Sequence, residues 1–339
     1  MSENKTYKAA AGWLASAIEA LNGADIEVLA PVADEAGIVS LAPVTSANDV
    51  CSDALNTLVP LKKIFFPRTE VLMNYKTGGE DGVEVRSPKE EVHEKIIIGS
   101  RPCDAASLEV FDAVFHWDYD DTGYSKRRES ATVVTVACTA PDAKCFCTTV
   151  GGSPQDVRGS DAIIYNLDDG NSIVAALTEK GEAFAERLSA VLKPVEDVDI
   201  PKAPELELKF DPHKVKQWLD DNFESEFWSE AALRCVGCGA CSYLCPTCHC
   251  FDIVDESTWN HGERRRNWDC CSFGTFTLHA SGHNPRADQT ARYRQRVMHK
   301  FKYIPDRFEK IACVGCGRCV RKCGVGQSIV QVLEDIGAK

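Results

Sequence analysis

The feature that most constrains this chain is a run of cysteines between residues 235 and 250. It holds six thiols: Cys235, Cys238, Cys241, Cys245, Cys248 and Cys250. The first four keep the spacing Cys-x2-Cys-x2-Cys-x3-Cys and are followed by Pro246. A second run nearly repeats this spacing at Cys313, Cys316, Cys319 and Cys323. The spacing is typical of bacterial iron-sulfur proteins, so the chain is expected to fold around metal clusters.

Two other uses of grouped cysteines fit the sequence less well. The chain has 17 cysteines, but it shows no export signal, and disulfide frameworks belong mainly to small secreted domains. Paired cysteines also hold structural zinc. Three cysteines at x2 spacing favour a cubane instead, because such a loop can give three thiolates to one cluster while the fourth cysteine reaches its neighbour.

The repeated run predicts a crossed arrangement of ligands. One 4Fe-4S cluster would be held by Cys235, Cys238, Cys241 and Cys323, and the other by Cys245, Cys313, Cys316 and Cys319. The metal would be iron, bound through these cysteines. Crossing ties the two runs into one compact unit and makes its folding depend on metal.

Length and composition are those of a globular protein with about two domains. The chain has 339 residues, and a typical domain has roughly 100–200. A hydrophobic fraction of 44% and a charged fraction of 26% support a buried core and a solvated surface. No segment reaches the roughly 18–20 apolar residues of a membrane span, so we expect a cytoplasmic protein. The net charge of -13 argues against general nucleic-acid binding.

The N-terminal 200 residues alternate between strand and helix patterns. Short apolar runs predict strands at Ile26 to Val32, Gly37 to Val44, Lys95 to Gly99, Thr132 to Ala137, Ala162 to Leu167 and Ser172 to Leu177. Helical spacing of apolar residues predicts helices at residues 7–22, 105–115 and 181–192. Lys76 to Glu91, with five acidic residues, predicts an exposed hairpin loop. The alternation predicts an α/β domain over residues 1–200, with its site at the carboxyl ends of the strands.

A proline-rich acidic segment follows this domain. Lys193 to Pro212 contains four prolines, which is typical of a linker. Helices are expected at residues 214–223 and 228–233, directly before Cys235. Residues 201–339 are therefore expected to form a mostly helical, bacterial-ferredoxin-like dicluster domain, with a 67-residue insertion between its two ligand runs. The predicted fold class is α+β.

Four cysteines of the N-terminal domain form a second group: Cys103, Cys138, Cys145 and Cys147. The first two directly follow predicted strands, where an α/β sheet places its site. We predict that the four thiols hold a third iron-sulfur cluster, although Cys-x6-Cys-x-Cys is not a standard ligand spacing. Cys51 stands alone and is expected to be a small buried apolar residue.

The insertion is basic, against the trend of the chain. Residues 261–310 hold 11 Lys and Arg against 5 Asp and Glu, and most of the excess comes from Arg264, Arg265, Arg266, Arg292, Arg294 and Arg296. These arginines could form a solvated helix face. They could also lie beside a cluster, which is a buried anion, and raise its potential. A third use is the docking of an acidic partner.

Three further thiols exceed what a two-cluster ferredoxin needs: Cys248, Cys250 and Cys271. They could complete a further metal site or share the N-terminal one, and Cys270 lies beside them in the sequence. Three histidines, His249, His279 and His283, are nitrogen donors, but a histidine in a polar loop more often forms only hydrogen bonds. We expect Cys248 and Cys250 to link the first ligand run to the N-terminal domain.

Several ordered motifs make the chain resemble a known iron-sulfur family. They are Arg101-Pro102-Cys103-Asp104, Cys138 with Cys145-Phe146-Cys147, Cys235 through Cys250, Arg264-Arg265-Arg266-Asn267-Trp268, Gly282-His283, Tyr293 to Lys302, and Cys313 to Cys319. The chain is similar to the family that contains the iron-sulfur electron-transfer subunit of anaerobic sulfite reductase and the beta subunit of cytosolic sulfhydrogenases. These motifs are specific to the family and not to one member.

The resemblance implies a non-catalytic electron-transfer subunit of a hetero-oligomeric complex. It would relay electrons between a flavin subunit that oxidises NAD(P)H and a catalytic partner: a hydrogenase, a sulfite reductase or a heterodisulfide-reductase-type module. The chain departs from the family pattern at Gly324, where a proline that fixes φ normally follows the last ligand. It also departs at Cys270, which has no family counterpart.

The residues themselves agree with a relay. The chain has no G-x-G-x-x-G motif after a strand and no P-loop, so we expect neither flavin nor NAD in it. Clusters with four thiolate ligands offer no open position to a substrate, so we expect no catalytic residue. Two alternatives remain. The extra cysteines could build a site-differentiated cluster that reduces a substrate, or the clusters could serve a redox sensor, although the sequence shows no output module.

Overall fold

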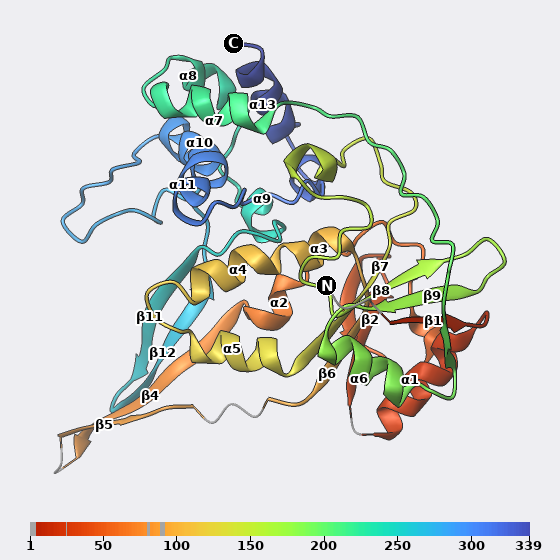
Figure 1. The fold of residues 1–339 in the computed structure, drawn as a ribbon. Coiled ribbons are helices and arrows are strands. Elements are labelled where there is room, and N and C mark those ends of the chain that lie inside the picture. The colour runs from red at the N-terminus through yellow and green to blue at the C-terminus, as the bar shows by residue number, and fades with distance from the viewer. Residues whose placement is uncertain (1–4, 25, 80–81, 89–91) are drawn as a thin grey trace.

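The computed structural model describes residues 5–24, 26–79, 82–88 and 92–339. These residues form a large mixed sheet, a smaller antiparallel sheet that extends to one side, and a group of helices above both (Figure 1). The first sheet belongs to the N-terminal part of the chain, and the helices belong to the C-terminal part. The fold is therefore mixed α/β.

The large sheet has eight strands in the order β10-β1-β9-β8-β7-β6-β2-β3. They are β1 (Thr6–Ala9), β2 (Glu27–Ala33), β3 (Val39–Pro43), β6 (Lys95–Ser100), β7 (Ala131–Val136), β8 (Ala162–Asn166), β9 (Ser172–Ala176) and β10 (Leu192–Val195). The four central strands β2, β6, β7 and β8 are parallel, and the outer pairs are antiparallel. The α/β prediction for this region is confirmed at this level.

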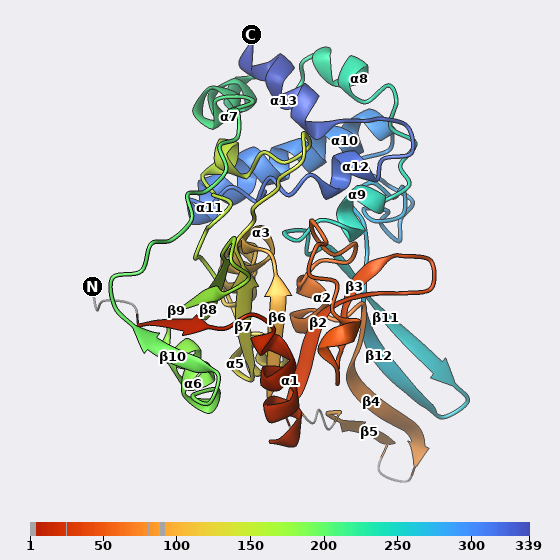
Figure 2. The ribbon, with the colours of Figure 1, turned by 90° about the vertical axis from the view of Figure 1, so that its right-hand side faces the viewer.

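Helices cover both faces of the large sheet (Figure 2). On one face lie α1 (Trp13–Gly23) and α6 (Glu179–Arg187), and on the other lie α2 (Lys62–Phe65), α4 (Leu108–Phe115) and α5 (Thr122–Glu129). Strand β6 supplies both cores, because Ile96 and Ile98 face α1 and α6 while Ile97 faces α4. A strand buried on both faces has the continuous apolar pattern from which β6 was predicted.

Three predicted helices have different bounds in the structure. Tyr7 lies in β1, and the helix begins only at Trp13, after Gly12 in the left-handed region at φ 77°. The helix predicted at residues 105–115 is divided into α3 (Pro102–Ala106) and α4. The helix predicted at 181–192 ends at Arg187, because Leu192 starts edge strand β10. At the start of the first predicted helix and at the end of the last, pairing within the sheet outweighs the helical spacing of apolar residues.

The second sheet joins the two halves of the chain. It consists of β4 (Thr69–Gly79), β5 (Gly82–Arg86), β11 (Phe251–Thr258) and β12 (His261–Trp268), in the order β11-β12-β4-β5. Part of the predicted loop at residues 76–91 is thus the β4–β5 hairpin, and residues 80–81 and 89–91 lie outside the described chain. Strand β12 belongs to the insertion between the ligand runs, and it pairs with β4 in antiparallel register.

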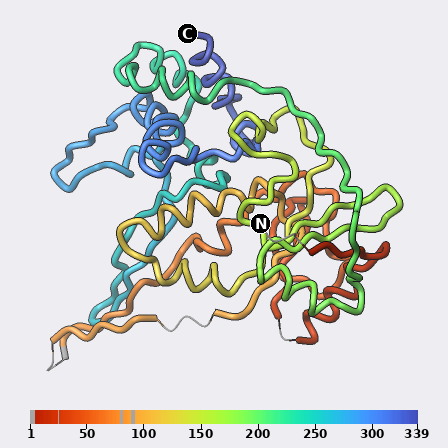
Figure 3. Tube along the Cα trace, in the orientation of Figure 1, coloured from red at the N-terminus to blue at the C-terminus, as the bar shows by residue number. Residues whose placement is uncertain are grey.

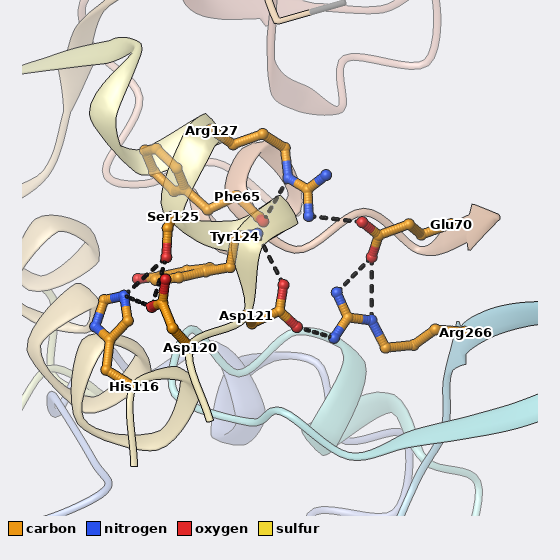
Figure 4. A network of polar contacts seen from close by, with 9 residues as sticks. All are labelled: Phe65, Glu70, His116, Asp120, Asp121, Tyr124, Ser125, Arg127 and Arg266. Carbon is orange, nitrogen blue, oxygen red and sulfur yellow. Dashed lines mark hydrogen bonds and ion pairs between the residues drawn. The ribbon is translucent and has the colours of Figure 1, made fainter. Parts of the chain in front are cut away.

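A buried ion-pair network fixes this junction (Figure 4). Arg266 of β12 pairs with Glu70 of β4 and with Asp121, which precedes α5. Glu70 also pairs with Arg127 of α5 at 2.9 Å, and Arg127 donates to the carbonyl oxygen of Phe65. The cations lower the pKa of Asp121 against the opposing effect of burial. Arg266 therefore anchors the insertion to the N-terminal half through carboxylates on β4 and before α5, and Arg127 of α5 completes the network.

The remaining chain is mostly helical. Its helices are α7 (Pro212–Asp221), α8 (Phe227–Ala231), α9 (Ala240–Tyr243), α10 (Gln289–Met298), the π-helix η3 (His299–Tyr303), α11 (Ile304–Phe308), α12 (Arg318–Arg321) and α13 (Ile329–Gly337). Short 3₁₀ turns lie at η1 (Ala47–Asp49) and η2 (Cys147–Val150). Residues 196–211 run along the outside of the molecule from β10 to α7 (Figure 3). Among the described residues no helix is long and apolar enough to cross a membrane.

Candidate metal centres

The first group of thiols lines one cavity between α9, α10 and the C-terminal ligand run. Its cysteines are Cys235, Cys238 and Cys241 of the first run and Cys319 and Cys323 of the second. The first three and Cys323 are the ligands that the crossed arrangement predicts, and Cys319 is assigned by the same prediction to the neighbouring cluster. We call this cavity site 1.

The groups around site 1 suit sulfur-containing ligands. The amide of Gln289 donates to the Cys235 sulfur, and the backbone N–H of Gln327 donates to the Cys323 sulfur, each at 3.2 Å. The buried hydroxyl of Ser272 lines the cavity and has no partner among the described residues. A buried polar atom without a partner is costly, so it is expected to meet a bound group. The residues of site 1 therefore fit an iron-sulfur cluster.

Glycines allow the first ligand run to curl. Gly239 has φ 78°, and a Cβ there would lie 2.7 Å from the ring of Phe273. The left-handed conformation and the close contact both require glycine. This turn begins α9 and places Cys241 on the cavity wall.

The second group, site 2, consists of Cys245, Cys313, Cys316 and Cys319. Their thiols are close enough for the charge on each to affect the others. Burial raises the pKa of Cys313 to about 11 and that of Cys319 to about 12. Because a metal ligand must be a thiolate, binding here would release protons and would depend on nearby positive charge.

Three buried cations supply that charge. Lys300 of η3 donates to the Cys245 sulfur at 3.2 Å, and Arg296 of α10 lies 3.6 Å from the Cys248 sulfur and donates to the Cys241 carbonyl oxygen. Lys62 of α2 donates to the Cys248 carbonyl oxygen at 2.8 Å and lies over the Trp268 ring. No carboxylate of the described residues forms an ion pair with any of the three. Burial lowers the pKa of Lys62 to about 8.

These cations need an anion. An unpaired charge in the protein interior costs several kcal/mol, about 3–5 when a buried ion pair loses one partner. Neighbouring thiolates are the available anions, and those of Cys245, Cys248 and Cys313 raise the pKa of Lys300 against the effect of burial. Sequence reasoning anticipated a role for Arg296 but missed Lys62 and Lys300. The one signal for Lys62 was a lysine in an otherwise apolar segment.

The third group, site 3, gathers the four N-terminal cysteines. Cys103 on α3, Cys138 after β7, and Cys145 and Cys147 at the start of η2 line one cavity. Arg101 shapes its wall by donating to the carbonyl oxygens of Ala54 at 2.7 Å and Ala137 at 3.3 Å. Burial raises the pKa of Cys147 to about 11, and the neighbouring Cys145 and Cys138 add to the effect. The fold thus brings together four thiols that lie up to 44 residues apart, between positions 103 and 147.

Sites 2 and 3 share a wall. Cys316 of site 2 also lines the cavity of site 3, and the backbone N–H of Phe146 donates to the carbonyl oxygen of Gly315 at 2.9 Å. A Cβ at Gly315 would lie 2.4 Å from the backbone nitrogen of Cys147. Only glycine permits this contact.

The remaining thiols of this region, Cys248, Cys250, Cys270 and Cys271, lie beside the candidate ligands or beside one another. Cys248 is next to Cys245, and Cys271 is next to both Cys250 and Cys270. None of these extra thiols lines the cavity of site 3. Their link to the N-terminal half is instead Lys62, which binds the Cys248 carbonyl oxygen. Cys51 is half-buried rather than fully buried.

The histidines form hydrogen bonds or ring contacts. His249 is buried against Phe111 and His299, its Nδ1 lies 3.1 Å from the Thr247 carbonyl oxygen, and burial lowers its pKa to about 4. His279 and His283 are exposed and in contact with each other. Among the described residues no three His, Cys, Asp or Glu side chains lie close enough to hold a single metal ion, whereas the thiols of sites 1 and 3 surround cavities.

The arginines of the basic insertion make two kinds of contact. Arg264, Arg265 and Arg266 lie on strand β12 rather than on a helix, and they pair with carboxylates. Arg294 likewise pairs with Glu224. Of the six arginines, Arg296 is the one in contact with the candidate ligands.

Comparison with known proteins agrees with this picture. The 4Fe-4S dicluster domain family matches residues 234–327, which contain both ligand runs. The beta subunit of sulfhydrogenase 2 from Pyrococcus furiosus is 30% identical over 304 residues, which are 86% of this chain and 87% of that protein.

The chain belongs to the sulfhydrogenase beta subunit family. The relationship extends over most of its length and so includes the N-terminal sheet as well as the ligand runs. The dicluster match implies two 4Fe-4S clusters within residues 234–327. Gly324, where a family proline was expected, is exposed. The backbone N–H of Gln327 donates to the sulfur of Cys323, the last ligand of the second run. The loop after the last ligand is thus fixed by a hydrogen bond rather than by a proline ring.

Proposed function

We propose that this protein is an iron-sulfur relay subunit with three clusters in a row. Site 1 would hold one 4Fe-4S cluster, site 2 a second and site 3 a third. Bound clusters of this kind accept and donate single electrons. The chain itself would supply thiolate ligands, buried cations and hydrogen-bond donors that hold the clusters and set their potentials.

The observation that carries this proposal is the wall that sites 2 and 3 share. Cys316 is a candidate ligand at site 2 and lines site 3, while Cys319, also a candidate ligand at site 2, lines site 1. Electron transfer requires redox centres that lie close together. Three neighbouring thiol groups, each sharing a lining residue with the next, suit a relay better than an isolated redox enzyme.

The partners follow from the family. The relative from Pyrococcus furiosus is named as a subunit of a sulfhydrogenase. We therefore propose that this chain works in a hetero-oligomeric complex, between a flavin subunit that oxidises NAD(P)H and a catalytic redox subunit. Under this proposal the chain binds no flavin or nicotinamide of its own and has no catalytic residue.

Metal analysis of anaerobically purified protein tests the proposal. Three cubanes predict about 12 irons and two predict about 8 per chain. The Cys147→Ser variant should lose about four irons and keep the electron paramagnetic resonance (EPR) signals of sites 1 and 2. Cys51→Ser, outside all three groups, is the matched control and should keep the full count.

The outcomes separate the parts of the proposal. An unchanged iron count in Cys147→Ser would reject site 3 alone. A wild-type preparation with zinc and almost no iron would reject the relay altogether.

A second candidate function, reduction of a small substrate, has one observation in its favour. A pocket of about 260 Å³ is lined by Cys103, Cys147 and Cys313, together with Arg158 and Lys310. A substrate there would lie against candidate ligands of sites 2 and 3. A change in the cluster spectrum on adding a small oxidised sulfur compound, absent in Arg158→Gln, would support this function over a pure relay.

A further inference from the structure

Site 1 contains the most exposed of the candidate ligands. All 17 cysteines lie in the described part of the chain, and Cys238 of site 1 is the one that is exposed. Cys245 and Cys316 of site 2 and Cys147 of site 3 are buried. A relay that ends at Cys238 would therefore meet its next redox centre at this point of the surface.

Exposed apolar side chains lie close to Cys238 in the sequence or line site 1 with it. Leu233 is 82% exposed and Val236 is 68% exposed, although both belong to the segment that leads into the first ligand run. Val325, just after the last ligand, is also exposed and lines site 1 together with Val236. We call Leu233, Val236, Cys238 and Val325 the Cys238 patch. Exposed apolar side chains that gather at one place mark interaction sites more often than single ones do.

Two exposed cationic residues adjoin this patch in the sequence. Arg234 precedes Cys235, and Lys322 precedes Cys323; both side chains are exposed. Neither forms an ion pair with a carboxylate of the described residues. The chain as a whole has a net charge of -13, so a cationic rim at this place runs against its general character. Such a rim attracts a partner with complementary negative charge.

We propose that the Cys238 patch is the docking surface for an electron-transfer protein that presents its own redox centre within an acidic rim. The inference rests on the proposed function and adds where electrons enter or leave the relay. Apolar contact would exclude water between the two centres, and Arg234 and Lys322 would orient the partner. The exchange is balanced, because one centre loses the single electron that the other gains and no bond or proton is involved.

Binding to a small acidic two-cluster ferredoxin tests this surface without relying on activity. The dissociation constant is measured anaerobically with iron-loaded protein at low and high salt. Leu233→Glu and Lys322→Glu should each weaken binding about tenfold or more, and binding by the wild type should weaken as salt rises. Trp259→Glu is the matched control: Trp259 is 98% exposed, at the β11–β12 turn far from α9 (Figure 1), and its variant should bind like the wild type.

Iron content and EPR spectra of each variant separate this proposal from the one on which it rests. Wild-type protein without iron would count against the relay. Iron-loaded Leu233→Glu and Lys322→Glu variants that bind as tightly as the wild type would overturn the docking surface, as would absence of salt-sensitive binding. Sedimentation that shows a wild-type dimer dissociated by Leu233→Glu would assign the patch to a second copy of the chain and would also overturn the proposal.

Discussion

Arg318 and Asp104 form an ion pair inside the protein, with 2.6 Å between Nη2 and Oδ2 and only 2% of each side chain exposed. Arg318 precedes Cys319 of site 2, and Asp104 follows Cys103 of site 3. Arg318 also donates through Nε to the Thr57 carbonyl oxygen at 2.7 Å. One pair thus joins the ligand segments of two candidate sites that are more than 200 residues apart in sequence.

The first prediction concerns this pair. Asp104→Asn keeps the shape of the side chain but leaves the Arg318 cation buried without its counter-charge. We expect the free energy of unfolding to fall by about 3–5 kcal/mol, measured by anaerobic chemical denaturation. Glu205→Gln removes one partner of the exposed Lys202–Glu205 pair and should change stability by less than about 0.5 kcal/mol. Equal effects of the two variants would contradict the structural role of Asp104.

Removal of a buried cation should lower cluster potentials. Arg296→Met keeps much of the side-chain volume but removes a charge that contacts Cys248 and the Cys241 carbonyl. A hydrogen bond to a charged group is worth about 1.5–3 kcal/mol, which corresponds to roughly 60–130 mV for a one-electron couple. We expect the potentials of sites 1 and 2 to fall by about this amount in an EPR-monitored redox titration.

The control for this variant lies on the same helix. Arg294→Met removes a cation that pairs with Glu224 and contacts no candidate ligand. Its potentials should stay at the wild-type values. A similar shift in both variants would mean that long-range charge, not contact with the ligands, sets the potentials.

The wall between sites 2 and 3 gives a third prediction. Gly315→Ala would place a methyl group 2.4 Å from the backbone nitrogen of Cys147, at a residue whose φ is 62°. The chain must separate at this wall, so the magnetic interaction between neighbouring reduced clusters should weaken in the EPR spectrum. Gly324→Ala is the control, since no atom lies within 4 Å of the added Cβ and its φ is not in the left-handed region. An unchanged interaction in Gly315→Ala would argue against adjacent clusters.

Removal of iron should unfold one part of the protein before the other. Without clusters Lys62, Arg296 and Lys300 keep no anionic partner except neighbouring thiols that prefer to be protonated. Hydrogen exchange should therefore become fast in α9, α10 and α12 after chelation, while the central strands β6 and β7 keep their protection. Uniform loss of protection in all elements would show that the two parts unfold as one unit.

Several features of the fold could be predicted from the sequence because their cause is local. The central strands have continuous apolar runs, since both their faces are buried, and residues such as Ile96 to Ile98 show this directly. The linker predicted at Lys193 to Pro212 follows from proline and charge, although its first residues form strand β10 and its last begins α7. Helix ends were less accurate, because Tyr7 and Leu192 belong to the strands β1 and β10, which pair with each other although they lie far apart in the sequence.

The pairing of β12 with β4 in the second sheet had no local signal. Arg266 pairs with Glu70 across 196 residues, and the residues of strand β12 indicated only a basic insertion within a mostly helical domain. Lys62 was hidden in the same way, because its contact with Cys248 spans 186 residues. Neither the spacing of residues nor the composition indicates contacts between residues so far apart in the sequence.

The sequence alone determined which cysteines are candidate ligands and in what local loops, because Cys-x2-Cys spacing and left-handed glycines act within a few residues. Only the tertiary structure decided which thiols meet. It brought Cys323 to the first run, placed Cys316 on the wall of site 3, and buried Lys62 beside Cys248. The physical reason is that these contacts depend on how two sheets and a group of helices pack. Packing brings together residues that are far apart in the sequence, and the local sequence around each residue does not reveal its partner.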